Sequence, residues 1–219
     1  MTGRTKGKYM RLLHYIVGPI QTNCYVLVAD SGEGIVIDPG ASGERIAGAL
    51  DNEGVKPVAV LLTHGHFDHV SGVEDFVKHY EKKPAVCILD KEMETLRDPE
   101  TNLTAVMGFK AEDFSPLITD TFSDGEEKNI AGFKFRVIWT PGHTPGGCSY
   151  FFKDEKMLFP GDTLFCESAG RTDFKGGSTS DEIHSIREKL LTLPDDVTVY
   201  PGHDSTTAIA FEKINNPYA

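Results

Sequence analysis

The sequence predicts an α/β fold in which two packed β-sheets carry helices on their outer faces, giving four layers. Strand-like segments fall into two blocks along the chain, and each block is followed by helical patterns. Because a sheet with an apolar face must bury it, two such blocks favour sheets packed against each other. No low-complexity tract or linker separates the blocks, so residues 1–219 are expected to form one domain, a size that α/β domains often reach.

The first block is a run of strands that turns into alternating helices and strands. Gly18-Pro19 is typical of a turn between strands. Ile46, Ala47 and Leu50 recur at helical spacing, which predicts the first helix. The elements predicted in this half are strands at 10–17, 23–29, 34–38, 57–63 and 84–89, and helices at 43–52 and 70–82.

The second block follows a less regular stretch at 90–125. There the pattern begins as helical and becomes irregular, because Pro99, Gly108 and Pro116 interrupt it. The elements predicted after it are strands at 133–139, 147–153, 156–160 and 197–200, and helices at 179–191 and 205–214.

Composition limits the partners and the compartment that can be expected. The formal net charge is −11, which argues against a large phosphate-binding surface, so no nucleic-acid partner is expected. The apolar runs are too short for a membrane span, and the basic N-terminus is not followed by the apolar core of a signal peptide. We therefore expect a cytoplasmic protein with no membrane partner. The 4 cysteines are widely spaced and include no Cys-x-x-Cys pair, which fits reduced thiols in that compartment.

Four short apolar runs each end on side chains that can bind metal. They are VAVLLTHGHFDH (58–69), FRVIWTPGH (135–143), MLFPGD (157–162) and VTVYPGH (197–203). Strands that stop on His or Asp can bring these side chains to one rim of a sheet. Six or seven such ligands exceed the four that one zinc ion usually takes, and they suit two ions held side by side. Two-metal sites mostly carry out hydrolysis, so the pattern predicts a hydrolytic metal centre.

The densest motif is HGHFDH at 64–69, on the turn between a predicted strand and a predicted helix. Residues two apart on a tight turn can point the same way, so His64 and His66 can hold one ion, while Asp68 and His69 reach a second. A polar helix cap accounts for one such residue, but not for three histidines and an aspartate within six positions. Three further strand-end residues, each explicable alone as a turn residue, complete the set: His143, Asp162 and His203. Imidazole and carboxylate ligands suit zinc, iron or manganese.

The motifs HGHFDH, GHTPG, PGDTLF and YPGH resemble the metal motifs of the metallo-β-lactamase superfamily, in register over almost the entire chain. The resemblance implies an αββα sandwich of two mixed sheets. It also implies two divalent metal ions, with zinc expected and iron or manganese as alternatives. Carried over by motif, the ligands are His64, His66 and His143 for the first ion, Asp68, His69 and His203 for the second, and Asp162 bridging both. Asp38 matches an aspartate that supports the cluster without binding metal.

Within the superfamily, the ligand pattern favours the glyoxalase II-like branch, which cleaves hydroxyacylglutathione thioesters. Zinc-type lactamases usually have a non-His residue after the Asp and a Cys at the later position, where this chain has His69 and Asp162. Flavo-diiron proteins carry a Glu where this chain has His66. The tRNA-processing branch needs an RNA-grasping arm, and none is evident in this acidic chain.

The stretch 170–174 resembles small single-domain glyoxalase II-like hydrolases, and also persulfide dioxygenases. Arg171 matches a Lys that holds glutathione in typical glyoxalase II, which makes it the candidate substrate-binding residue; a salt bridge with Asp173 is the alternative. The Tyr that accompanies that Lys has no counterpart here. Because the chain ends at Ala219, the C-terminal helical domain that completes the thiol groove in typical glyoxalase II is expected to be missing.

The predicted function is metal-dependent hydrolysis of a small, anionic thioester of the hydroxyacylglutathione type. Two cations would acidify a shared water to supply hydroxide near neutral pH, and Asp68 and Asp162 are the predicted catalytic carboxylates. A thiolate leaves readily, because its pKa lies near ~8.5, so no strong general acid is needed. The alternatives are a persulfide dioxygenase with one iron on His64, His143 and Asp162, a hydrolase of another small ester or phosphoester, and a centre that only braces the fold.

The stretch 90–125 also bears on substrate selection. It holds Met93, Met107, Phe109 and Phe114 between the two halves of the chain. These residues either overhang the metal rim as a lid or belong to helices packed on a sheet edge.

Overall fold

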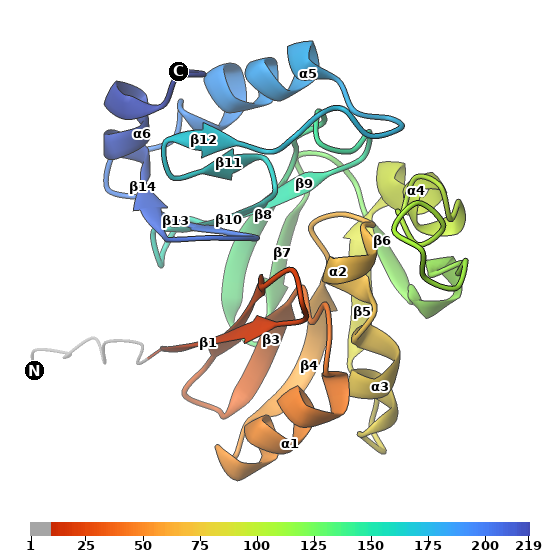
Figure 1. Ribbon diagram of the computed structural model, residues 1–219. Helices are drawn as coiled ribbons and strands as arrows, with labels where there is room; N and C mark the ends of the chain where they lie inside the picture. The colour runs from red at the N-terminus through yellow and green to blue at the C-terminus, as the bar shows by residue number, and fades with distance from the viewer. Residues whose placement is uncertain (1–9) are drawn as a thin grey trace, which may run out of the picture.

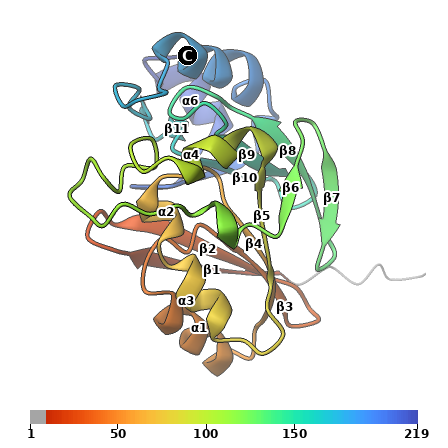
Figure 2. The same ribbon diagram turned by 90° about the vertical axis from the view of Figure 1, so that its right-hand side faces the viewer.

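The computed structural model describes residues 10–219 and shows two packed sheets of six strands each, with helices outside both (Figures 1 and 2). Helices α1 (Gly43–Asn52) and α3 (Val73–Lys78) lie on the outer side of the first sheet. Helices α5 (Thr179–His184) and α6 (Ile209–Asn215) lie on the outer side of the second. The predicted four-layer α/β sandwich is confirmed.

The first sheet is mixed and brings two functional turns to one edge. Its strands, in spatial order, are β1 (Arg11–Val17), β2 (Thr22–Val28), β3 (Glu33–Ile37), β4 (Lys56–Leu61), β5 (Ala85–Leu89) and β6 (Asp120–Phe122). β1, β2 and β3 are antiparallel, whereas β3, β4, β5 and β6 are parallel. Because parallel strands end at the same edge, Asp38 after β3 lies beside the turn that follows β4.

The second sheet is also mixed and brings the later motifs to one edge. Its strands, in spatial order, are β14 (Thr207–Ala208), β13 (Thr198–Pro201), β10 (Met157–Gly161), β9 (Cys148–Phe152), β8 (Phe133–Trp139) and β7 (Glu127–Ile130). β10 and β13 are parallel and pair Gly161 with Pro201, so Asp162 and His203 follow neighbouring strand ends. β8 and β10 both run antiparallel to β9, which places the 140–143 loop at the same edge.

Three apolar layers hold the four structural layers together. Val26 of β2 packs into the core between the first sheet and its helices, where Leu50 of α1 is fully buried. Its neighbour Leu27 points the opposite way into the core between the sheets, with Tyr150 of β9. Leu158 of β10 belongs to the third core, under the helices of the second sheet. The alternation along β2 is the period of two expected for a strand buried on both faces.

The helix predicted at 70–82 is confirmed only over α3, which begins at Val73 and ends at Lys78. The chain instead forms α2 (Phe67–Val70) and α3, with a break at Ser71-Gly72. A Cβ at Gly72 would lie 2.3 Å from the carbonyl oxygen of Pro39, so the loop after β3 passes directly over the break. This tertiary contact is invisible in the helical period of the sequence.

The other differences between the predicted and the observed elements lie at helix ends and at sheet edges. The helix predicted at 205–214 begins only at Ile209, because Thr207–Ala208 pairs with β13 as β14. The helix predicted at 179–191 is α5 followed by a π-helical turn, η3 (Ser185–Leu190). The short edge strands β6 and β7 and the hairpin of β11 (Leu164–Phe165) and β12 (Ser168–Ala169) were not predicted, because two to four residues carry little periodic signal.

The stretch 90–125 is only partly helical. Its helices are η1 (Asp90–Glu92), α4 (Met93–Arg97) and η2 (Ser115–Leu117). Within residues 10–219, no helix combines the length and the apolar character that crossing a bilayer requires.

Gly40 offers a test of the close packing at the functional edge. A Cβ at this position would lie 1.5 Å from the carbonyl oxygen of Asp68, which is backbone and cannot move independently. We expect Gly40→Ala to lower the free energy of unfolding by at least about 2 kcal/mol, measured by urea denaturation. The matched control is Gly48→Ala in α1, where a Cβ meets nothing within 4 Å. It should stabilise the protein by about 0.5–1 kcal/mol. Equal stability of both variants would contradict the packing described here.

Candidate metal centre

The turn after β4 supplies two histidines to the centre. His64 lies on the turn itself, and His66 directly precedes α2 in an extended conformation with φ −66° and ψ 143°. Asp68 and His69 belong to α2. The three histidines are buried, with exposures of 2% for His64, 3% for His66 and 0% for His69. Burial of this many imidazoles on one turn removes their rings from water.

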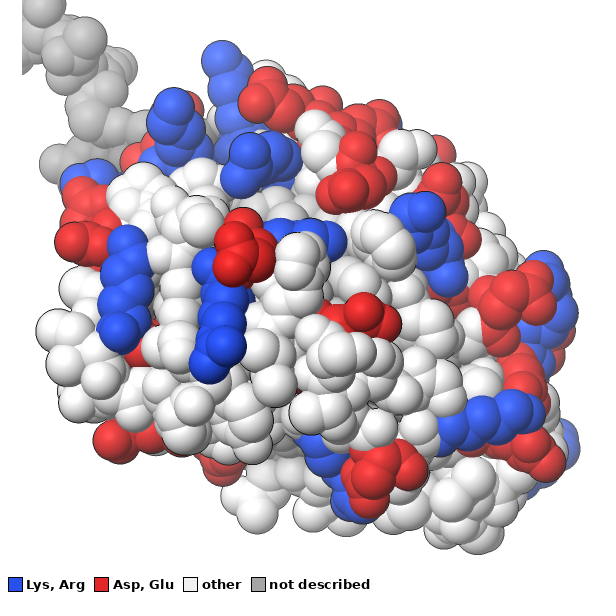
Figure 3. Space-filling model, turned by 90° about the horizontal axis from the view of Figure 1, so that it is seen from above, with Lys and Arg blue, Asp and Glu red and all other residues white. Residues whose placement is uncertain are grey.

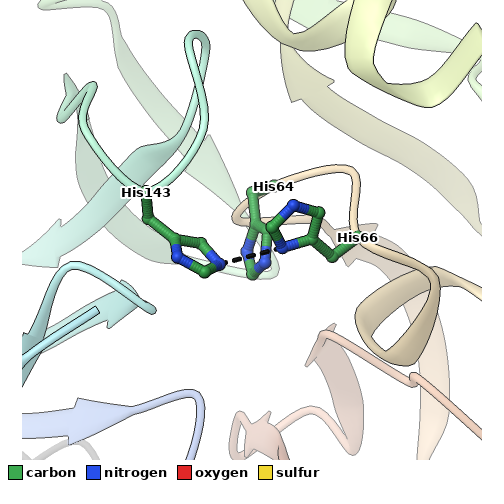
Figure 4. Close-up of side chains that lie close together, drawn as sticks. All are labelled: His64, His66 and His143. Carbon is green, nitrogen blue, oxygen red and sulfur yellow. Dashed lines mark hydrogen bonds between the residues drawn. The ribbon is translucent and has the colours of Figure 1, made fainter. Parts of the chain in front are cut away.

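His143 joins the first pair from the other sheet. Its Nε2 lies 2.9 Å from Nδ1 of His66, and the ligand atoms of His64, His66 and His143 lie within 4.8 Å of one another. Figure 4 shows the three rings converging, with His143 coming from the loop after β8. The sequence-predicted first ligand set is thus brought together in space.

The second predicted set converges beside it. The Nε2 atom of His203 lies 3.2 Å from Oδ2 of Asp68 and 3.4 Å from Nε2 of His69. Asp162 lies between the two sets. Its Oδ2 is 3.4 Å from Nε2 of His203 and 3.6 Å from Nε2 of His143. All seven residues predicted as ligands therefore meet at the edge where the two sheets adjoin, and none of the candidate groups within residues 10–219 includes a cysteine.

The electrostatic state of the first set fits metal binding. Burial lowers the pKa of His64, His66 and His143, with further lowering by neighbouring imidazoles. These rings are therefore neutral, which is the form of imidazole that binds metal. The Nε2 atom of His64 is buried and has no hydrogen-bond partner, a costly condition that a cation at this position would relieve. The donor set of nitrogens and carboxylate oxygens suits a divalent metal ion.

The carboxylates remain ionised. Burial alone would raise their pKa values, but the charge of His69 holds the pKa of Asp68 at about 2 and that of Asp162 well below its usual range. Burial opposes the charge on His203, yet hydrogen bonds to Asp162 and Asp68 raise its pKa to about 10. A proton there balances the carboxylates, so binding of a cation by these residues would release protons.

Residues that hydrogen-bond to the ligand side chains fix the orientation of the ligand rings. Asp38 accepts from the Thr63 amide at 2.8 Å, and its Oδ2 lies 2.9 Å from Nδ1 of His69. Nδ1 of His143 donates to the carbonyl of Arg171 at 2.7 Å. In both histidines this leaves Nε2 facing the centre, the arrangement that carboxylate or carbonyl partners impose on metal-binding imidazoles. The structure thus places Asp38 behind the cluster, where the sequence comparison predicted it.

Two buried glutamates beside the centre were missed by sequence reasoning. Glu92 is fully buried, and its two oxygens accept from the Gly65 amide at 2.9 Å and the Gly146 amide at 2.7 Å. Glu182 accepts from the backbone amide of His143 at 2.8 Å. Burial raises the pKa of Glu92 to about 7 and that of Glu182 to about 9. No sequence signal distinguishes either residue from an ordinary helix-surface glutamate.

The side chain of Arg171 forms the salt bridge that the sequence left as the alternative to substrate binding. Its guanidinium is exposed and holds Asp173 in a two-pronged ion pair, with both distances 2.7 Å. The guanidinium carbon also lies 4.0 Å from the centre of the Phe174 ring. The structure therefore contains the Asp173 salt bridge, while the Arg171 carbonyl contacts His143 directly.

Comparison with known proteins agrees with this geometry. A family model described as the metallo-beta-lactamase superfamily matches residues 17–203. The probable metallo-hydrolase YqgX of Bacillus subtilis (strain 168) is 36% identical over 203 residues, which cover 92% of this chain and 94% of that protein. The hydroxyacylglutathione hydrolase GloC of Haemophilus influenzae (strain ATCC 51907 / DSM 11121 / KW20 / Rd) is 33% identical over 209 residues, covering 92% and 94%.

Solved structures agree with the fold and extend the comparison. The crystal structure of BLEG-1 B3 metallo-beta-lactamase superposes with a TM-score of 0.89 at 36% identity, covering 95% of this chain and 99% of that one. The crystal structure of TTHA1623 in a di-iron-bound form gives a TM-score of 0.82 at 30% identity, covering 94% and 100%. With a family model matching most of its length and a similar fold in both structures, the chain belongs to the metallo-beta-lactamase superfamily.

Proposed function

We propose that this protein is a metal-dependent hydrolase with two divalent ions at its centre, and that it cleaves thioesters of the hydroxyacylglutathione type. The observation that carries the proposal is the position of Asp162, whose Oδ2 is 3.4 Å from His203 Nε2 and 3.6 Å from His143 Nε2. One carboxylate facing two ligand sets is what a pair of adjacent ions requires. The similarity to a di-iron-bound structure and to GloC supports both parts.

The proposed assignment of residues to the two metal ions follows from the distances between the ligand atoms. His64, His66 and His143 would hold one ion, Asp68, His69 and His203 the other, and Asp162 both. When bound, such ions acidify water and polarise a carbonyl oxygen. Asp38 keeps Nε2 of His69 directed at the centre by engaging Nδ1. Zinc is the metal we propose, with iron and manganese as the alternatives to be tested.

The surroundings favour a substrate with a good leaving group. Glu92 and Glu182 lie beside the centre, where they accept from the backbone amides of Gly65, Gly146 and His143. The seven predicted ligands include no separate general acid to protonate a departing amine. A thiolate needs no such proton, because its pKa lies near ~8.5. The geometry therefore supports thioester cleavage over amide cleavage.

The proposed partner is a small molecule rather than a nucleic acid or a membrane. The net charge of the chain is −11. On the face shown in Figure 3, Lys and Arg are interspersed with Asp and Glu and form no continuous basic surface. Binding to a phosphate backbone depends on such a surface.

The proposal predicts a dependence on two metal ions per chain. Protein loaded separately with zinc, iron or manganese should hydrolyse S-lactoylglutathione. A chelator should abolish turnover, and adding the metal back should restore it. The second ligand set, Asp68, His69 and His203, has no use in a one-iron dioxygenase, so metal analysis decides between the two reactions. Iron near one per chain with persulfide oxidation would overturn the proposal, as would turnover confined to a β-lactam or a phosphoester in the same assays.

A further inference from the structure

An open hollow of about 410 Å³ lies between the segment 100–106 and the loop 173–175. Its size falls in the range of small-molecule sites. In Figure 2 the chain that follows α4 runs beside α2, and the Phe67 amide donates to the Asn102 carbonyl at 2.9 Å, which ties the two together. The apolar residues that line the hollow are Leu103, Ala105, Val106 and Phe174.

Phe174 links the wall of the hollow to the predicted metal centre. The centre of the Phe174 ring lies 6.0 Å from that of His66, edge to face. Phe174 therefore borders a predicted metal ligand on one side and the hollow on the other. On the adjoining helix, Phe67 packs against Phe109, with the rings tilted by 40° and their centres 4.8 Å apart.

The cations at this site are already neutralised. Arg171 holds Asp173 with two contacts of 2.7 Å. Lys175 contacts Asp98 at 2.9 Å and Glu100 at 2.6 Å. To pair with Arg171 or Lys175, a carboxylate of a bound substrate would have to displace the acidic residues that already contact them, whereas an apolar group displaces only water.

The segment beyond the hollow exposes large apolar side chains. Val106 is 56% exposed, Met107 48% and Phe109 51%. Three such residues within four positions, beside a catalytic centre, mark a binding surface more than a solvent-facing loop. This segment lies in the stretch 90–125 for which the sequence left a lid and edge packing as alternatives.

We propose that this hollow binds an apolar chain of the thioester, so that aliphatic thioesters are better substrates than S-lactoylglutathione. The inference rests on the proposed thioesterase function for the chemistry, but the apolar site is defined by its own residues. Val106 is the best place to test it, because it lines the hollow and is 56% exposed, so a polar replacement there leaves the core intact.

The test measures binding without turnover. S-hexylglutathione and S-methylglutathione are thioethers that cannot be hydrolysed, and they differ only in the length of the alkyl chain. The ratio of their affinities, measured by calorimetry on the metal-loaded protein, therefore gives the contribution of the alkyl chain to binding. A fully buried methylene contributes roughly fourfold in affinity, so half burial of the additional chain gives about 30-fold tighter binding of the hexyl compound. Val106→Asp should reduce this ratio below about threefold. Ile214→Asp on α6, where Ile214 is 83% exposed, is the matched control and should keep it.

Kinetics then separate the two proposals. Hexanoylglutathione should be hydrolysed with a higher kcat/KM than S-lactoylglutathione, and Val106→Asp should remove the advantage. Equal binding of the two thioethers by the unaltered protein would overturn the apolar site, as would an unchanged ratio in Val106→Asp. If the binding ratio holds but no thioester is cleaved, the apolar site stands and the proposed function fails.

Discussion

Asp162→Ala is expected to reduce kcat/KM by more than about 100-fold and to lower the metal content below two ions per chain. Loss of an outer partner of a ligand already costs roughly 10–100-fold in metal affinity or activity. Asp162 faces both ligand sets, with Oδ2 3.4 Å from His203 Nε2 and 3.6 Å from His143 Nε2, so its loss affects both. Metal analysis by mass spectrometry and thioester kinetics on the same preparation measure the two effects together.

The fold should survive this substitution. Asp162 directly follows β10 and belongs to none of the three apolar cores. Circular dichroism should therefore be unchanged. Asp154→Ala, on an exposed turn after β9, is the control and should keep both metal and activity. A variant at Asp162 that retains two ions and near-normal turnover would show that this carboxylate does not join the two sites.

Glu92→Gln should weaken metal binding although Glu92 touches no predicted ligand. Its two oxygens accept from Gly65, between His64 and His66, and from Gly146, three residues after His143. One carboxylate therefore clamps together the two loops that carry the first ligand set. An amide has only one acceptor oxygen, so one backbone N–H must lose its partner. We expect a loss of about 10–100-fold in metal affinity, measured by competition with a chelating dye.

A matched control separates positioning from stability. Glu212 is also fully buried and accepts from a backbone amide, that of Glu167 at 3.0 Å, but it belongs to α6. Glu212→Gln should destabilise the protein to a similar degree, by about 1–3 kcal/mol, and leave metal affinity unchanged. Equal losses of metal affinity in both variants would mean that Glu92 acts only through general stability.

The pH dependence of stability gives an independent check on Glu92. Burial raises its pKa from 4.5 to about 7, so between these values the folded state binds more protons at this carboxyl than the unfolded state does. Its contribution to the free energy of unfolding therefore falls as pH rises through this window. Glu92→Gln should lack that part of the decline. Urea denaturation at pH 5 and pH 7.5 on wild type and variant compares them directly; parallel declines would contradict the assignment.

Much of the fold followed from local patterns. β2 and β4 are long enough for their apolar period to identify them, and both were predicted. The same patterns placed His64, His143, Asp162 and His203 at strand ends. Strand ends at one edge of a sheet must lie close together, so convergence of the ligands could be expected before any coordinates.

Other features depended on contacts between distant segments. The break at Gly72 exists because the loop at Pro39 passes within 2.3 Å of where a Cβ would stand. The short strands β6 and β7 pair only because a partner strand is already present. Neither effect leaves a periodic trace in the local sequence.

The sequence by itself determined the four-layer class and the positions of the candidate ligands at strand ends, because residue type and strand period are local properties. The division of these ligands into two sets is what the resemblance of the motifs to the metallo-β-lactamase superfamily implies. Only the tertiary structure decided that Glu92 and Glu182 secure the ligand loops, that Arg171 is engaged with Asp173, and that an apolar hollow opens beside His66. Those features depend on which backbone amides, charges and side chains meet across the fold, and a glutamate or arginine has the same local sequence signal whether it meets a partner or faces water.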